Sequence, residues 1–270
     1  MSILALRAAT ALALNATAAV IATKRGSVTA AGGITGLVVG TGIFIAGGLW
    51  LWSLLMVFFV SGSVVSRIGR NRKEPLQRLH EKGSRRDPLQ VLANGGVGLM
   101  AAIGYAVTGH SAFAVACAAS FATANADTWA GEIGVLSHRA PRSILTGQHL
   151  PAGTSGGISL LGLVASAAAA ALIAGAFSLG WLLHYGHSRI VALAATVIAA
   201  GITGALIDSL LGATLQAHYT DRRSGKPTER RCTNGTENQL LRGWRGFNND
   251  AVNATSNLIV CVAVLAVEFV

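Results

Sequence analysis

Long apolar stretches separated by short polar segments dominate the chain. A membrane-spanning helix needs about 20 mostly apolar residues, and eight stretches meet this requirement. They cover residues 3–22, 27–46, 49–66, 90–108, 111–130, 157–180, 190–215 and 251–269. The pattern predicts an all-α, polytopic transmembrane bundle of seven to eight spans, which forms a single integral membrane domain over residues 1–270.

The N-terminal third of this pattern leaves two alternatives open. The apolar stretch from Val28 to Val65 is too long for one helix, and its glycines, among them Gly47 and Gly48, favour a break there. The first stretch is either a span or a cleaved signal peptide. Lys24 and Arg25 follow it, whereas a signal peptide carries its positive charge ahead of the apolar region. A retained span is therefore favoured.

Composition agrees with a membrane protein, because 52% of the residues are hydrophobic and only 12% are charged. The formal net charge of +10 is concentrated in two basic loops, residues 67–88 and 216–250. In the eight-span arrangement both loops lie at one face, which the positive-inside rule makes cytoplasmic. Topology alone explains most of these Arg and Lys residues. No transit segment leads the chain, which favours a prokaryotic plasma membrane or a thylakoid membrane.

Polar residues inside or beside the spans gather at the same cytoplasmic face. They are Asn94, Asp127, Glu132, Thr154, Ser155, Asp208, Asn248, Asn249, Asp250 and Asn253, together with Gly153, Gly156 and Gly157 of the stretch that carries Thr154 and Ser155. Ionisable residues at membrane depth are costly and usually serve binding, transport or catalysis. One shared site between the helix ends explains the whole set.

Four carboxylates in this set are candidate metal ligands: Asp127, Glu132, Asp208 and Asp250. Carboxylates in a small space repel one another unless a cation joins them, and Mg²⁺ prefers oxygen ligands. The alternative for Asp127 and Asp208 is a structural hydrogen bond to a neighbouring helix. For Glu132 the alternative is an ordinary position at a helix end.

The Gly153–Gly157 stretch leads into an apolar helix, and free amides and hydroxyls ahead of a helix suit phosphate. It lacks the Gly-Lys-Ser or Gly-Lys-Thr of a Walker loop, and an ordinary Ser or Thr N-cap is the alternative. Asn248, Asn249 and Asn253 supply more amides than a cap needs. They favour ligand contact, with capping as the alternative.

Five motifs in order together resemble the transmembrane-protein-19 family, which includes the phytyl-phosphate kinases. The motifs are Gln90-Val-Leu-Ala-Asn94-Gly-Gly, Asp127-Thr-Trp-Ala-Gly-Glu132-Ile-Gly, Pro151-Ala-Gly-Thr-Ser-Gly-Gly-Ile-Ser, Asp208-Ser-Leu-Leu-Gly-Ala and Asn248-Asn-Asp-Ala-Val-Asn253. The resemblance covers roughly residues 60–265. The second motif is also similar to the Asp-x-x-Ala-x-x-x-Gly signature of polyprenol kinases and CDP-lipid synthases.

The resemblance implies a membrane kinase that moves a phosphoryl group from CTP, or another nucleoside triphosphate, onto an isoprenyl monophosphate such as phytyl phosphate. Asp127 and Asp208 would then hold Mg²⁺ on the donor phosphates, supported by Glu132 and Asp250. Thr154, Ser155 and the neighbouring glycine amides would bind phosphate. Arg139 and Arg142, in the short loop between two of the motifs, are the candidate cationic clamps.

Two other functions remain open at this point. A CDP-lipid synthase-like cytidylyltransferase would use the same metal and nucleotide, and a secondary transporter would also place acids within spans. The expected partners are an isoprenyl phosphate lipid, a nucleoside triphosphate and membrane lipids. Nucleic-acid binding is not expected, because no basic surface interleaved with aromatic residues occurs. A homodimer is compatible with the sequence.

Overall fold

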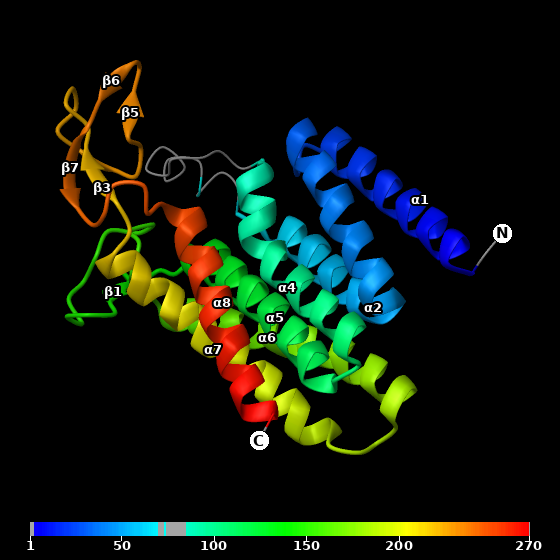
Figure 1. The fold of residues 1–270 in the computed structure, drawn as a ribbon. Helices are drawn as coiled ribbons and strands as arrows, with labels where there is room; N and C mark the ends of the chain where they lie inside the picture. The colour runs from blue at the N-terminus through cyan, green and yellow to red at the C-terminus, as the bar shows by residue number, and fades with distance from the viewer. Residues whose placement is uncertain (1–2, 70–72, 74–84, 270) are drawn as a thin grey trace.

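The computed structural model describes residues 3–69, 73 and 85–269 of the chain. Figure 1 shows the described part as a bundle of long helices with small β-strands at one end. The helices are α1 (Ile3–Lys24), α2 (Ala30–Val65), α4 (Pro88–Thr108), α5 (Ser111–Gly134), α6 (Leu160–Tyr185), α7 (Ile190–Thr214) and α8 (Asn249–Glu268). Much of the basic loop predicted at residues 67–88, including Arg70, Arg72, Arg78 and Lys82, lies outside the described residues.

The predicted fold class, an all-α transmembrane bundle, is confirmed. Six helices within the described residues are long and apolar enough to cross a membrane: α1, α2, α4, α6, α7 and α8. Large apolar side chains remain exposed on their outer surfaces, as expected where lipid replaces water; Val107, Leu160 and Val191 are examples.

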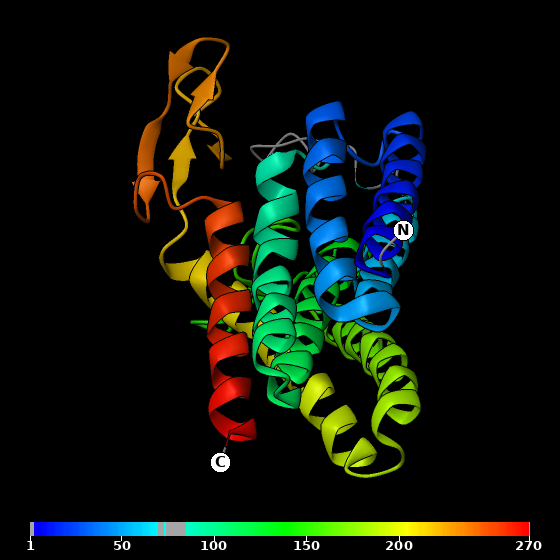
Figure 2. The same ribbon diagram turned by 45° about the vertical axis from the view of Figure 1, so that its right-hand side comes forward.

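The helix α2 is two antiparallel helices joined at Gly48, as the glycines predicted. Its 36 residues would measure about 54 Å if straight, far more than a bilayer core of about 30 Å. At Gly48 the backbone has φ 68° and ψ −167°, a conformation essentially restricted to glycine. Arg86 lies beside both ends of the hairpin, since its carbonyl accepts from Thr29 N and its guanidinium covers Phe58. The chain therefore crosses the bundle twice within α2 (Figure 2).

The helix α5 lies at the centre of the bundle, where it packs against α2, α4, α6, α7 and α8. Residues 114–126, mostly alanine, are all buried. Small side chains let the neighbouring helices approach closely. Because protein rather than lipid surrounds α5, this helix tolerates polar residues that an exposed span would not.

Short strands that the sequence did not predict lie between the helix ends on one side of the bundle. β1 (Arg142–Ser143) pairs with β2 (Gly157–Ile158), and β5 (Cys232–Thr233) pairs with β6 (Thr236–Glu237). β3 (His218–Thr220) lies between β4 (Pro227–Thr228) and β7 (Gln239–Arg242). We call residues 218–242 the β-lobe, and the end of the bundle where it lies the loop face.

Arg242 ties the β-lobe to the bundle. Its guanidinium donates to the carbonyl of Ala213, at the end of α7, over 2.5 Å, and to His218 Nε2 over 3.2 Å. Burial, followed by the nearby Arg242 charge, lowers the pKa of His218, which keeps the ring neutral and able to accept this bond. The strands are therefore held at a defined position over the helix ends.

Aromatic side chains lock the opposite end of the bundle. Trp50, just after the α2 turn, stacks on His184 with ring centroids 4.7 Å apart. Tyr105 and Tyr185 share a hydrogen bond of 2.8 Å between their hydroxyls. Amphipathic aromatic rings are typical of the membrane–water boundary, so this cluster marks the second face.

We expect Gly48→Ala to destabilise the protein by about 1–3 kcal/mol, because a Cβ is strained in this backbone conformation. The measurement is thermal unfolding of the detergent-purified protein. Gly175→Ala is the matched control, since Gly175 lies within α6 and a Cβ there meets no neighbouring atom within 4 Å. Equal unfolding temperatures for the two variants would contradict the hairpin.

Candidate functional site

A cavity of about 900 Å³ opens among the helix ends at the loop face. It is lined by residues from distant parts of the chain that the sequence placed in one site: Asn94, Asp127, Glu132, Arg139, Gly153, Thr154, Ser155, Gly156, Gly157, Asp208, Asn248, Asn249, Asp250 and Asn253. The structure therefore brings these residues to one cavity. Their chemical roles stay predictions.

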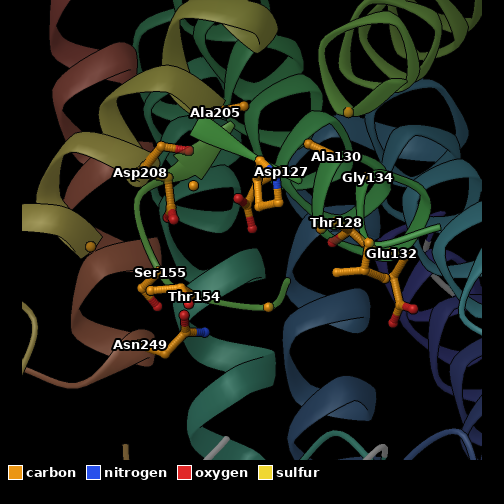
Figure 3. Close-up of a pocket in the computed structure, with 18 of the residues that line it drawn as sticks. Asp127, Thr128, Ala130, Glu132, Gly134, Thr154, Ser155, Ala205, Asp208 and Asn249 are labelled. Atoms are coloured by element: carbon orange, nitrogen blue, oxygen red, sulfur yellow. The ribbon is translucent and has the colours of Figure 1, made fainter. Parts of the chain in front are cut away.

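Asp127 and Asp208 form the centre of the cavity. The two carboxyl groups face each other within hydrogen-bonding range, about 10 Å inside the ends of α5 and α7. Ser256 of α8 donates to Asp208 Oδ2 over 3.2 Å. Figure 3 shows both aspartates directed into the same space, with Thr154, Ser155 and Asn249 across that space from them. Carboxyl groups this close cannot both stay ionised without a counter-charge.

Glu132 does not join this pair, contrary to the predicted set of four ligands. Its carboxylate is 2.6 Å from Lys73 Nζ, and Figure 3 shows it directed away from the aspartates. The physical reason is helical geometry, because residues five apart in α5 point roughly 140° apart around the axis. Glu132 instead fixes a buried lysine at the cavity wall.

The cavity could hold a divalent cation between two carboxylates, and not among the four that the sequence predicted. No group of three or more His, Cys, Asp or Glu side chains with metal-ligand spacing occurs in the described part of the chain. Mg²⁺ commonly keeps several waters and takes only one or two carboxylates plus substrate phosphates. Asn253 adds a further oxygen to the cavity lining, because its Oδ1 is buried with no hydrogen-bond partner among the described residues. The residues present therefore suit Mg²⁺ bound jointly with a phosphate ligand.

The Gly153–Gly157 stretch lines the cavity but is not the start of α6, which corrects the predicted helix boundary. The helix begins at Leu160, and Ser159 is its N-cap, with Oγ accepting from Gly162 N. The stretch instead forms turns that end in β2. Gly156 has φ 84° and lies against Ala213 of α7, where a Cβ would collide. The hydroxyl of Ser155 donates to Glu229 of the β-lobe over 2.7 Å.

The first turn of α8 divides its amides between capping and the cavity. Asn248 is the N-cap, and its side chain accepts from Ala251 N over 3.2 Å. Asn249 and Asp250 line the cavity, as does Asn253 one turn later. Asn94 also faces the cavity while its amide donates to Gln90 O within α4. The surplus amides are therefore positioned for a ligand.

The two predicted clamp arginines lie in different places. Arg139 lines the cavity. Arg142 does not, because it lies in β1 and its guanidinium donates to Gly147 O within its own loop. The strand pairing of Arg142 with Ile158 holds the side chain in this position.

Several cationic side chains at the cavity wall were not singled out from the sequence: Arg25, Arg67, Lys73, Arg85 and Arg86. The positive-inside rule already explained basic residues in these segments, so charge alone carried no further signal. One local signal existed at Arg86. It directly precedes Asp87 and Pro88, the N-cap and first residue of α4, which places it at a helix entrance.

Comparison with known proteins gives a family match over most of the chain. Residues 13–261 match the family described as integral membrane protein DUF92. The chain is 31% identical to Protein PGR of Arabidopsis thaliana over 87% of both chains. It is 39% identical to an uncharacterised membrane protein of Methanocaldococcus jannaschii, over 59% of this chain and 63% of that one. An uncharacterised Synechocystis membrane protein is 30% identical over 66% of this chain and 68% of that one. No solved structure matches.

We expect Mg²⁺ to raise the thermal stability of the wild-type protein but not that of Asp127→Asn. At about one hundred times its Kd the cation stabilises by about 2.7 kcal/mol. In chelator, Asp127→Asn should be more stable than the wild type, because the exchange removes repulsion within the carboxyl pair. Thermal unfolding with chelator or Mg²⁺ measures both effects. Glu237→Gln, which alters an exposed acid of the β-lobe, is the control. If Mg²⁺ stabilised Asp127→Asn as much as it stabilises the wild type, Asp127 would be excluded as a ligand of the cation.

Proposed function

The chain belongs to the DUF92 family of integral membrane proteins, and from its cavity we propose that it is a kinase acting on a lipid monophosphate. The phosphoryl donor is CTP or another nucleoside triphosphate, and the acceptor is an isoprenyl monophosphate such as phytyl phosphate. The observation that carries the proposal is the facing pair Asp127 and Asp208 in a cavity whose wall holds several arginines and one lysine.

In the proposed reaction the phosphoryl group passes directly from donor to acceptor, and the protein forms no covalent bond with either. An oxygen of the acceptor phosphate bonds to the γ-phosphorus of the donor, and the bond from that phosphorus to the β–γ bridging oxygen breaks. CDP leaves with the bridging oxygen, and the acceptor becomes a diphosphate. The acceptor oxygen is already ionised at neutral pH, so no strong general base is needed. Catalysis then rests on alignment and charge neutralisation.

The residues of the cavity divide this work between metal and phosphate binding. Asp127, Asp208 and Asn253 are the proposed holders of Mg²⁺, which neutralises developing charge on the donor phosphates. Thr154 and Ser155 line the cavity with the aspartates; the Thr154 hydroxyl is proposed to donate to phosphate, and Ser155 would do so by exchanging its bond to Glu229. Arg139 at the wall supplies positive charge to the phosphates.

The remaining polar residues are assigned to the nucleotide and the entrance. Asn94, Asn248, Asn249 and Asp250 surround the cavity at the starts of α4 and α8, where amide and carboxylate groups suit recognition of ribose or base. By the positive-inside rule the loop face is cytoplasmic, in a plasma or thylakoid membrane. The cavity then opens to the compartment that contains CTP.

The position of the site favours an enzyme over a transporter. A transporter binds its substrate near the middle of the membrane and opens alternately to both faces. Here the acids lie about 10 Å from the helix ends, and the opposite end is packed by aromatic side chains such as Trp50 and Tyr185. A lipid-phosphate substrate needs access only at the headgroup level.

We expect Asp208→Asn and Asp127→Asn each to lower turnover at least about a hundredfold, since each removes a proposed metal ligand. The assay incubates purified protein in lipid nanodiscs with labelled CTP, Mg²⁺ and phytyl phosphate, and separates the nucleotide products. Release of CDP with formation of a diphosphate lipid supports the kinase.

Two results would overturn this assignment. Pyrophosphate in place of CDP would identify a cytidylyltransferase of the CDP-lipid synthase type, which uses the same site. Undiminished turnover in both aspartate variants would remove the proposed metal site. Glu237→Gln serves as control, and an unchanged rate for it shows that loss of an arbitrary acid does not matter.

A further inference from the structure

A second pocket, almost entirely apolar, lies between α1, the two halves of α2 and the start of α4. Its volume is about 80 Å³. The wall includes alanines of α1, glycines of the first half of α2, and larger apolar side chains of the second half: Ala18, Ala22, Gly32, Gly36, Leu55, Met56, Phe58 and Phe59. Asn15 at the wall is already engaged, because it donates to Ala11 O and accepts from Trp52 Nε1.

The apolar pocket and the polar cavity share a boundary. Arg86, Gln90 and Asn94 line both of them. A molecule with an apolar part in one and a charged part in the other would therefore cross this boundary at Arg86. Amphiphiles with a phosphate headgroup have this division of properties.

Arg86 is built into the boundary with little freedom. Its backbone N donates to Ser27 O, and its carbonyl accepts from Thr29 N. The guanidinium carbon lies 5.1 Å from the Phe58 ring centroid and 5.6 Å from that of Phe59. The aliphatic part of the Arg86 side chain packs on apolar surface, and its guanidinium contacts two aromatic rings. These contacts hold the side chain against the apolar pocket.

The guanidinium of Arg86 is short of acceptors. Among the described residues its Nη1 is buried and has no hydrogen-bond partner. Burial lowers the pKa of Arg86, and the charge of Glu132 opposes this effect. A buried cation with an unpaired donor is costly unless an anion completes it, and guanidinium groups bind phosphate with two parallel hydrogen bonds.

We propose that this pocket receives the first part of the hydrocarbon tail of the lipid monophosphate acceptor and that Arg86 holds the acceptor phosphate at its mouth. The assignment rests on the proposed kinase function and adds the direction from which the acceptor enters, between α1 and α2. A cavity of about 150 Å³ takes a benzene molecule, so this pocket of about 80 Å³ takes a group of about half that size, which is part of the isoprene unit next to the phosphate.

Gly36 offers a clean way to fill the pocket. It lines the wall, and an added Cβ meets no neighbouring atom within 4 Å. Gly36→Leu therefore places a side chain in the pocket without a backbone collision, and Gly36→Ala adds only a methyl group. Gly175→Leu introduces the same side chain on α6, at a position equally free of neighbours and outside both cavities.

The binding test needs no turnover. The probe is a phytyl phosphate analogue with a diazirine in the first isoprene unit, irradiated with the protein in nanodiscs and mapped by mass spectrometry. We expect labelling on the wall residues of α2, competition by phytyl phosphate but not by phytol, and a decrease of roughly tenfold or more in Gly36→Leu, equal to about 1.4 kcal/mol. Gly36→Ala and Gly175→Leu should label like the wild type.

Three results would overturn the proposal: labelling elsewhere in the protein, labelling unchanged in Gly36→Leu, or equal competition by phytol. The last of these would identify the pocket as a general lipid site. Arg86→Gln tests the headgroup, and we expect it to abolish the preference for phytyl phosphate over phytol. A preference that persists in this variant contradicts the role of Arg86, provided that the variant unfolds at the wild-type temperature.

Turnover separates this proposal from the kinase assignment. With CTP, Gly36→Leu should raise the KM for phytyl phosphate and leave that for methyl phosphate, which has no isoprene unit to enter the pocket, nearly unchanged. Specific labelling without turnover of any acceptor would retain the tail pocket and reject the kinase. Turnover of phytyl phosphate at the wild-type KM in Gly36→Leu would retain the kinase and reject the pocket.

Discussion

The close approach of α5 to α7 is the constraint on which the site depends. A Cβ on Gly204 would collide with Thr123, and a Cβ on Gly201 would press on Ala122. Thr123 Oγ1 also donates to Ala200 O across the same contact over 3.4 Å. One turn further along each helix are Asp127 and Asp208. Small residues in the middle of the bundle therefore set the separation of two carboxyl groups at its end, on which the proposed binding of a cation depends.

A polar central helix is stable here because its neighbours supply the hydrogen bonds that lipid cannot. Asn125 accepts from Ser61 of α2 over 2.9 Å and donates to Ala169 O of α6 over 3.0 Å. Asn257 of α8 accepts from Ser120 over 3.5 Å. Such bonds fix the rotation of α5 about its axis. These contacts, made nearer the middle of the bundle than Asp127, therefore determine the direction in which the Asp127 side chain points.

Hydropathy was sufficient for most of the fold, and residue type for the membership of the cavity. The spans, the break in α2 near Gly48 and the meeting of Asp127 with Asp208 followed from local pattern and topology. The position of Glu132 could not be predicted in this way, because its partner Lys73 is distant in sequence. The N-cap at Ser159 was also not predicted. Arg86 was not singled out, because the positive-inside rule already explained a basic residue in this loop. Its importance appears only when a helix hairpin places Phe58 beneath it.

The burial of α5 among the other helices has a consequence for how the membrane topology of relatives is interpreted. Freed from contact with lipid, α5 falls outside the helices that qualify as spans by length and hydropathy. A count of membrane crossings that includes both halves of α2 but omits α5 gives an odd number. Every segment after α5 is then assigned to the wrong side of the membrane. It would assign Arg86 and Glu229, which line one cavity, to opposite compartments. Topology diagrams for such proteins need the parity of crossings checked against shared polar contacts.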